Sequence, residues 1–313
     1  MILLSSGTMA AEPWRAALAE AAPGRPVVVA GAEPYDPAAI RYALVWKHPP
    51  GLLAGLPNLE VVFSLGAGVE HVLSDPSLPD VPLARVVDPD LTRRMTEWIV
   101  WRVLAHHRRA EAYRLQQAAR VWRDLPQPIG AEVRVGFLGL GVLGRDAAAM
   151  VARLGFDVAG WSRTPSSLGG FPTFSGADGL DAFLARTDIL VSLLPLTPET
   201  RGILNAGLFG KLARDGALGG PVLINAGRGG LQVEADILAA LDAGVLAEAS
   251  LDVFETEPLP AASPLWTHPK VTITPHVSAV SHAPAIARLI AGQIARHEAG
   301  LPLDHLVDHA RGY

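Results

Sequence analysis

The chain has 313 residues, half of them hydrophobic, and a formal net charge of −5 at neutral pH. This length and composition predict two domains with sizeable cores, and the negative charge argues against a nucleic-acid-binding protein, which would usually show a basic face. The absence of cysteine excludes disulfides, a thiolate nucleophile and cysteine-ligated metal sites.

The N-terminal residues do not predict a signal peptide, because no basic segment precedes a long apolar run. No stretch of about 18 or more consecutive apolar residues predicts a membrane span. We therefore expect a cytoplasmic protein that binds neither a membrane nor a nucleic acid.

Short β-branched runs alternate with longer helical patterns, which predicts an α/β fold with parallel sheets. A helical pattern without Gly or Pro runs from about residue 91 to residue 122 and separates two series of strands. A final helical pattern covers residues 284–300. The first series of predicted strands covers residues 2–6, 27–30, 43–47, 61–66 and 84–87, and the second covers residues 133–139, 156–162, 188–195, 221–227, 249–254 and 271–276.

Gly139, Gly141 and Gly144 form a G-x-G-x-x-G motif between an apolar strand and a helical pattern. The first glycine allows a tight turn, the second lets a pyrophosphate approach the backbone, and the third lets the helix pack closely on the strand. We expect the following helix N-terminus, including Val142 and Leu143, to offer N–H donors to the phosphates. The alternative is a purely structural glycine turn.

The next strand ends in Ser162, Arg163 and Thr164, where an NAD-preferring site usually has an acidic residue. No carboxylate would repel a 2′-phosphate here, and Arg163 and the two hydroxyls could bind one. These residues predict that NADP(H) is preferred over NAD(H). The alternative is a solvated arginine in an ordinary loop.

Arg228, Glu257 and His276 follow later strands, at the sheet edge where α/β proteins bind ligands. His276 is suited to proton donation, and a neighbouring Glu257 would favour the imidazolium and orient the ring. Arg228 offers a bidentate fork for a carboxylate. Singly, such residues are more often structural, but their order predicts a catalytic set. No compact His/Asp/Glu set has metal-ligand spacing, so we predict no metal.

Several long motifs resemble the D-isomer-specific 2-hydroxyacid dehydrogenase family, namely those at residues 189–205, 223–230 and 264–276. Other segments resemble the A-type glyoxylate/hydroxypyruvate reductases of that family, namely residues 44–59, 64–73, 160–164, 275–280 and 310–313.

The resemblance implies two Rossmann-like, doubly wound domains with an active-site cleft between them. The substrate-binding domain would comprise residues 1–98 plus 283–313, and the coenzyme domain residues 99–282. The family is usually dimeric through its coenzyme domains, so a homodimer is expected, with the long helix in the interface.

The resemblance also implies individual roles. The backbone of Gly66, Ala67 and Gly68 would cradle the substrate carboxylate together with Arg228, and Trp46 would line the substrate site, although its residue type alone favours a core position. Asp252 would contact the nicotinamide amide. The remaining expected cofactor contacts are Leu194, Pro195 and Ala226.

Three further features bear on activity. Gly227 stands where the family commonly has alanine, which could loosen Arg228 or permit close cofactor approach. Lys47 is an added cation that could aid anionic substrates, although we interpret it as solvated. The pair Glu257-Pro258 follows the hydroxyacid pattern, whereas the formate-oxidising branch has Gln-Pro.

The resemblance predicts an NADPH-dependent reductase that converts glyoxylate to glycolate and hydroxypyruvate to glycerate. Hydride would pass to the keto carbon and His276 would protonate the oxygen. The alternatives are a reductase of a bulkier 2-oxoacid and a dinucleotide-sensing interaction protein on the same fold.

Overall fold

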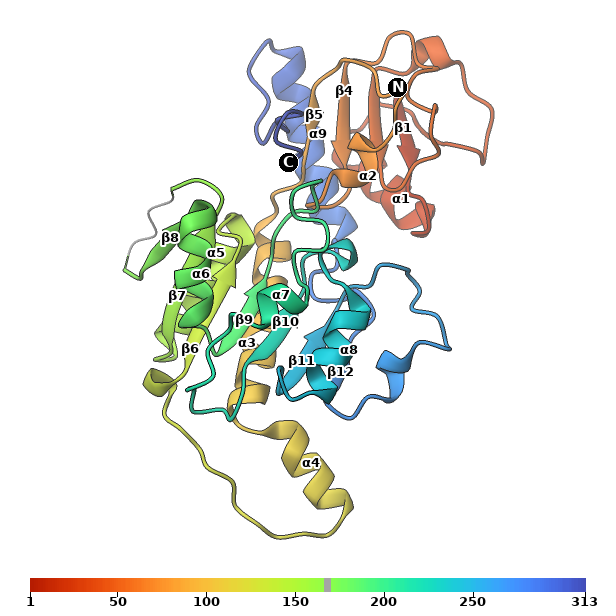
Figure 1. Cartoon of the computed structure of the whole chain (residues 1–313). Coiled ribbons are helices and arrows are strands. Elements are labelled where there is room, and N and C mark those ends of the chain that lie inside the picture. Colours follow the sequence, from red (N-terminus) through yellow and green to blue (C-terminus); the bar gives the residue numbers. More distant parts are fainter. Residues whose placement is uncertain (166–169) are drawn as a thin grey trace. The chain divides into compact units, whose positions relative to one another are not determined.

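The computed structural model describes residues 1–165 and 170–313, which divide into two compact units. Unit 1 comprises Met1–Leu91 and Ser281–Tyr313, and unit 2 comprises Thr92–Val280. In Figure 1 the first and last segments of the chain, at the two ends of the colour scale, lie together in unit 1. No helix within the described ranges is long and apolar enough to cross a bilayer.

Unit 1 contains a parallel sheet of five strands in the order β2-β1-β3-β4-β5. Helices α1 (Ala11–Ala21) and α9 (Ala283–Glu298) pack on one face through Leu18, Ile286 and Ile290, among other side chains. Loops and the short α2 (Glu70–Leu73) cover the other face. The strands are β1 (Ile2–Ser5), β2 (Val27–Val29), β3 (Tyr42–Val45), β4 (Val61–Ser64) and β5 (Leu83–Ala84).

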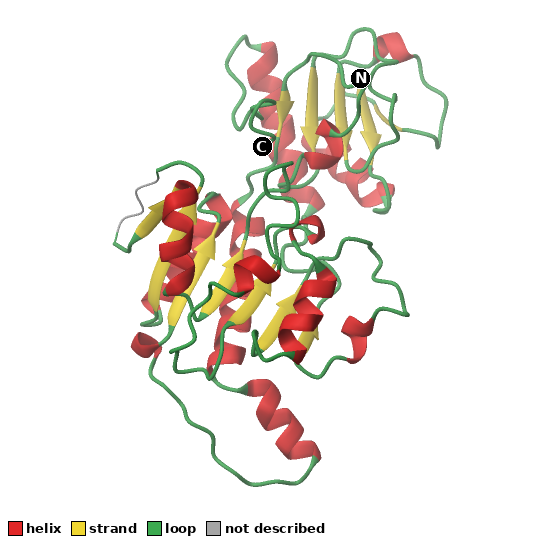
Figure 2. Ribbon diagram, in the orientation of Figure 1, coloured by secondary structure: helices red, strands yellow, loops and turns green. Residues whose placement is uncertain are grey.

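Unit 2 contains a parallel sheet of seven strands in the order β12-β11-β10-β9-β6-β7-β8. The strand order reverses at β6, which lies between β9 and β7, as in doubly wound folds. Figure 2 shows these strands running in one direction between helices. The strands are β6 (Arg134–Leu138), β7 (Asp157–Ser162), β8 (Thr173–Ser175), β9 (Ile189–Ser192), β10 (Val222–Asn225), β11 (Glu248–Leu251) and β12 (Val271–Ile273).

Helices cover both faces of this sheet. Two of them bury aliphatic and aromatic side chains on one face, namely α3 (Pro89–His107) and α5 (Val142–Arg153). Three others pack on the opposite face, namely α6 (Gly176–Ala185), α7 (Ala206–Phe209) and α8 (Glu234–Asp242). Because both faces of the sheet are covered, the sequences of its strands are nearly continuous apolar runs, as is usual in parallel sheets. The predicted fold class, two Rossmann-like parallel sheets, is confirmed.

The prediction of one uninterrupted helix to residue 122 is wrong. Helix α3 ends at His107, and α4 (Ala110–Ala118) begins after Arg109, whose backbone is left-handed with φ of 57°. The guanidinium of Arg109 donates to the carbonyl of Leu218 at 2.7 Å, which holds the break in place. Helix α4 buries no residue, so no packing against a core holds it in line with the axis of α3. In Figure 1, α4 and the chain after it extend away from the sheet of unit 2.

Candidate active site

The candidate cofactor and catalytic residues of unit 2 lie at one edge of its sheet, because each follows the carboxyl end of a parallel strand. His276 follows β12 and Arg163 follows β7, five strands away in the sheet order. At about 4.8 Å per strand, this step spans roughly 24 Å. The edge therefore suits a ligand whose two ends are recognised by different strands. Between them, Asp252 follows β11, Arg228 follows β10, Leu194 follows β9 and Gly139 follows β6.

The glycine motif forms the turn between β6 and α5. Gly139 has φ of 101°, and a Cβ there would lie 2.8 Å from the carbonyl oxygen of Leu193. A Cβ on Gly144 would collide with the carbonyl oxygen of Gly139. A Cβ on Gly141 would meet no heavy atom within 4 Å. The backbone there, beside the N-terminus of α5, is therefore open to a ligand. This geometry fits a bound pyrophosphate.

The end of β7 forms a tight polar turn. The hydroxyl of Ser162 donates to the carbonyl of Thr164 at 2.7 Å, while the side chains of Arg163 and Thr164 are exposed. The pKa of Glu199 is lowered, first by a hydrogen bond from the Thr197 hydroxyl and also by the positive charge of Arg163. Arg163 therefore lies close enough to the loop after β9 for its positive charge to favour the ionised carboxylate of Glu199.

Arg228 stands on a loop braced by buried polar side chains. The amide of Asn225 donates to the carbonyl of Arg228 at 3.2 Å and to Gln232 at 2.8 Å, and its oxygen accepts from the N–H of Gly227 at 3.1 Å. Gln232 in turn donates to the carbonyl of Val253 at 3.0 Å. The roles of Asn225 and Gln232 were not predicted, although an asparagine ending an apolar strand was a usable signal.

Gly227 is a position of close packing. A Cβ there would lie 2.8 Å from Cδ1 of Leu231 and 2.9 Å from the carbonyl oxygen of Leu194. The missing side chain thus lets the loop of Arg228 approach the backbone after β9. This close approach, rather than a left-handed backbone, accounts for glycine at this position.

Asp252 organises the loop that carries His276. Its fully buried carboxylate accepts hydrogen bonds from the Thr274 hydroxyl at 2.5 Å, the Val277 N–H at 2.9 Å and the Ser278 N–H at 3.0 Å. Its carbonyl accepts from the N–H of His276 at 2.8 Å. His276 itself has a left-handed backbone with φ of 54°, which these bonds on both sides hold.

The predicted acid–base pair is in contact. Nδ1 of His276 lies 2.9 Å and 3.0 Å from the two carboxylate oxygens of Glu257. The same carboxylate accepts from the N–H of Phe254 at 3.1 Å, which fixes its orientation. With Nδ1 engaged and about a third of the imidazole side chain exposed, Nε2 is the nitrogen left to face a ligand. The arrangement can hold a proton at Nε2 and deliver it.

The candidate substrate residues of unit 1 also follow neighbouring strands. Trp46 follows β3, and the loop from Gly66 to Gly68 follows β4. The loop is braced by Ser64, whose hydroxyl donates to the carbonyl of Gly68 at 2.9 Å and accepts from the N–H of Gly66 at 3.3 Å. Within the described part of the chain, the N–H groups of Ala67 and Gly68 have no acceptor. They can therefore donate to an anion.

Trp46 packs against this loop. A Cβ on Gly66 would lie 2.5 Å from Cζ3 of the indole, so the ring lies directly on the glycine backbone. The ring centroids of Trp46 and His71 are 4.5 Å apart. Trp46 is half-buried, so one part of it packs in unit 1 and another part reaches the surface.

Among residues 1–165 and 170–313, no group of three or more His, Asp or Glu side chains is arranged to hold a metal ion. The absence of a metal from the reaction stays a prediction.

Comparison with known proteins agrees with this geometry. The family model for the D-isomer specific 2-hydroxyacid dehydrogenase NAD-binding domain matches residues 100–278. A glyoxylate/hydroxypyruvate reductase A of Serratia proteamaculans is 42% identical over 309 residues, which cover 97% of this chain and 96% of that protein. That of Yersinia enterocolitica is 42% identical over 278 residues, or 87% of each chain.

Solved structures are similar over the full length. The NADPH-dependent glyoxylate/hydroxypyruvate reductase of Sinorhizobium meliloti, in complex with NADP and sulfate, is 53% identical with a TM-score of 0.95 and covers 100% of this chain and 99% of its own. A D-isomer specific 2-hydroxyacid dehydrogenase of Xanthobacter autotrophicus, in complex with NADPH and MES, is 44% identical with a TM-score of 0.94, at the same coverage. These matches confirm the resemblance predicted from the sequence, and the chain belongs to the D-isomer specific 2-hydroxyacid dehydrogenase family.

Proposed function

We propose that the chain is an NADPH-dependent reductase of small 2-oxoacids, with glyoxylate and hydroxypyruvate as its preferred substrates. The observation that carries the proposal is the contact between His276 and Glu257 at the same sheet edge as the glycine turn. The relatives that bear the name of glyoxylate/hydroxypyruvate reductase support the choice of substrate. The similar structures in complex with NADP or NADPH support the choice of cofactor.

Each residue has a defined task in this reaction. Gly139, Gly141 and the first turn of α5 bind the pyrophosphate, and Arg163 binds the 2′-phosphate. Bound NADPH supplies the hydride that reduces the keto carbon. Arg228 and the N–H groups of Ala67 and Gly68 hold the substrate carboxylate.

The proton comes from the chain itself. His276 holds it at Nε2 and transfers it to the developing alkoxide, while the Glu257 carboxylate at Nδ1 orients the ring. Asp252 keeps His276 in place through the loop on either side of it. The contact of Asp252 with the nicotinamide amide, and those of Leu194, Pro195 and Ala226 with the cofactor, are part of the same proposal.

The test is the loss of reduced-nicotinamide absorbance with glyoxylate, hydroxypyruvate, phenylpyruvate and a branched-chain 2-oxoacid. We expect kcat/KM to be highest for the two small substrates. A preference for phenylpyruvate would instead support the bulkier-substrate alternative. Tight NADPH binding without oxidation by any 2-oxoacid would support the dinucleotide-sensing alternative.

A substitution at Arg163 tests the preference for NADPH over NADH. Arg163→Asp should reverse the ratio of kcat/KM for NADPH to that for NADH, because a carboxylate repels the 2′-phosphate and accepts from a 2′-hydroxyl. Arg153→Asp, at the far end of α5, is the matched control and should leave the ratio unchanged. An unaltered ratio in Arg163→Asp would refute the assignment.

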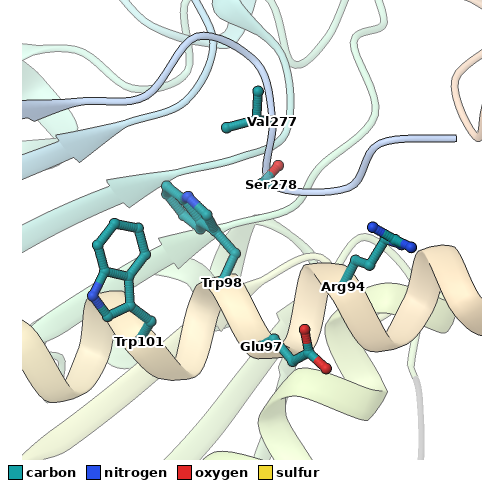
Figure 3. Close-up of a pocket in the computed structure, with 6 residues that line it drawn as sticks. All are labelled: Arg94, Glu97, Trp98, Trp101, Val277 and Ser278. Atoms are coloured by element: carbon teal, nitrogen blue, oxygen red, sulfur yellow. The ribbon is translucent and has the colours of Figure 1, made fainter.

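We also propose that the chain forms a homodimer through α3 and the segment from α4 to Ile129. On that segment, Trp122 is fully exposed and Ile129 is 66% exposed, and a cavity of about 570 Å³ lies beside Trp122. On α3, Trp98 and Trp101 line a second cavity of about 340 Å³ below Val277 and Ser278 (Figure 3). Exposed aromatic side chains such as those of Trp101 and Trp122 are enriched at surfaces that bind another protein.

A further inference from the structure

We propose that His48 and Asp75 form a buried anchor that positions Trp46 at the substrate end of unit 1 and so sets the affinity for the 2-oxoacid. The proposal rests on the proposed function, because it takes Trp46 to line the substrate site of the proposed reductase, as the family resemblance implies. His48 and Asp75 belong to unit 1, whereas the glycine turn, the Arg228 loop and the His276 loop belong to unit 2. The pair would act through Trp46 and is therefore a positioning pair.

The pair is buried although both side chains can carry charge. The side chain of His48 is 0% exposed and that of Asp75 is 2% exposed, with Nε2 of His48 3.3 Å from Oδ2 of Asp75. The carboxylate also accepts from the Gly51 N–H at 3.0 Å, the Ser77 N–H at 2.9 Å and the Ser77 hydroxyl at 2.6 Å. A buried carboxylate is tolerated when it is satisfied in this way. Asp75 thereby joins the loop after β3 to the loop after α2.

The anchor adjoins a strained backbone. Lys47, between Trp46 and His48, has a left-handed backbone with φ of 46°, which is unfavourable for a residue with a side chain. Before it, the N–H of Trp46 donates to the carbonyl of Ser5 at 2.8 Å. After it, His48 is held by Asp75. The left-handed turn at Lys47 is therefore fixed from both sides.

This turn determines where the indole lies. The backbone before Lys47 is closely packed, since a Cβ on Gly7 would collide with the carbonyl oxygen of Trp46. The indole then rests on Gly66, at the start of the loop whose Ala67 and Gly68 N–H groups can donate to an anion. If His48 were released, the strain at Lys47 would relax and the indole would leave Gly66. The wall of the substrate site would then be less ordered.

The kinetic test compares His48→Leu, His48→Gln and the wild type. Leucine fills the space without a donor, whereas the glutamine amide can replace Nε2–H. We expect His48→Leu to raise KM for glyoxylate about tenfold, the equivalent of one lost hydrogen bond to a charged group. KM for NADPH and kcat should stay within twofold, and His48→Gln should restore most of the affinity. An unchanged KM for glyoxylate would overturn the proposal.

A matched control is His107→Leu, which removes another buried histidine, one that packs on Phe156 in unit 2 with ring centroids 5.0 Å apart. It should leave KM for glyoxylate unchanged. If His48→Leu lowered kcat and raised KM for both substrates together, as general destabilisation would, the positioning role would also be overturned.

A second measurement does not depend on activity. Acrylamide quenching of Trp46 is obtained as the difference between each protein and its Trp46→Phe counterpart. We expect the quenching constant of Trp46 to rise about twofold in His48→Leu but not in His107→Leu. An unchanged constant overturns the anchor even if the wild type reduces no 2-oxoacid, in which case the proposed function fails separately.

Discussion

Single carboxylates in unit 2 each accept several hydrogen bonds and thereby orient a neighbouring group. Glu257 receives the Phe254 N–H and also contacts Nδ1 of His276. A carboxylate has about four acceptor sites, so it can fix a backbone and a ring together. Because both oxygens of Glu257 lie within 3.0 Å of Nδ1, the imidazole plane is held and Nε2 has a defined direction.

The direct test of this residue pair is His276→Ala. We expect kcat for glyoxylate reduction to fall about 10²–10⁴-fold, the usual contribution of a general acid. Glu257→Gln, which keeps the shape but removes the charge, should lower kcat less, by roughly 10–100-fold. His268→Ala is the matched control, since the hydrogen bonds of the His268 imidazole within the described residues go to the exposed Asp242 and to the N–H of Lys270. A near-normal kcat in His276→Ala would remove His276 from the mechanism.

Asp75 makes a pH-dependent contribution to stability. Its pKa is lowered from 3.8 to about 2, chiefly by the Ser77 hydroxyl and further by the N–H groups of Ser77 and Gly51 and by His48. Because the folded-state pKa lies below the unfolded one, this stabilisation is present above about pH 4 and is lost as the pH falls towards 2.

Asp75→Asn should therefore be less stable than the wild type at pH 7, and the difference should shrink between pH 4 and pH 2. Urea unfolding followed by tryptophan fluorescence measures the difference at each pH. A difference that stays constant over this range would contradict the assignment.

Among the elements of unit 2, the loop between β12 and α9 is held by Asp252, the residue that follows β11. Asp252 → Asn would place an amide NH₂ where the carboxylate now accepts from Thr274, Val277 or Ser278. An unsatisfied buried donor costs about 1–3 kcal/mol. We expect faster hydrogen exchange in residues 274–280 and a lower kcat. Asp242→Asn, at an exposed carboxylate, should change neither the exchange nor kcat. Unaltered exchange in Asp252→Asn would show that the hydrogen bonds to Asp252 do not hold this loop.

The loop after β10 is packed too closely at Gly227 to accept a side chain without a shift. Gly227→Ala should destabilise unit 2 by roughly 1–3 kcal/mol, because the carbonyl of Leu194 cannot yield to the new methyl as a side chain could. Gly292→Ala, in the middle of α9 with no atom near its Cβ position, should instead stabilise the protein by about 0.5–1 kcal/mol. Thermal unfolding should show a lower Tm for Gly227→Ala and a higher Tm for Gly292→Ala than for the wild type. Equal changes in Tm would contradict the packing argument.

Much of this level of structure follows from local sequence. The strands were predicted to within a few residues, because apolar runs such as Val27–Val29 are bounded by Gly and Pro. The short β8 was not predicted, since its three residues have no distinctive pattern. The break at Arg109 and the bonds to Asp252 depend on partners more than twenty residues away along the chain. The residue types of the site and the pairing of His276 with Glu257 could be predicted, but the bonds of Asn225 and Asp252 that hold the surrounding loops could not.

At the scale of the whole molecule, the exposed segment after α4 bears on assembly. Trp122→Ser should weaken the proposed homodimer, because an indole buried in an interface contributes about 2 kcal/mol or more. Sedimentation velocity at micromolar concentration should show a shift towards monomer. Trp266→Ser, which removes a half-exposed indole on another loop of unit 2, should leave the distribution unchanged. A wild type that is monomeric at these concentrations would rule the dimer out.

The position of α9 in the core of unit 1 has a consequence for synthesis. Ile286, Ile290 and Ile294 are buried against strands made from the first ninety residues. During translation those strands leave the ribosome long before α9 exists, whereas unit 2 is one continuous segment. Since segments fold as they are completed, unit 2 can fold on the ribosome first. The N-terminal strands then keep their apolar surface uncovered, and open to chaperones, until α9 has been made and released.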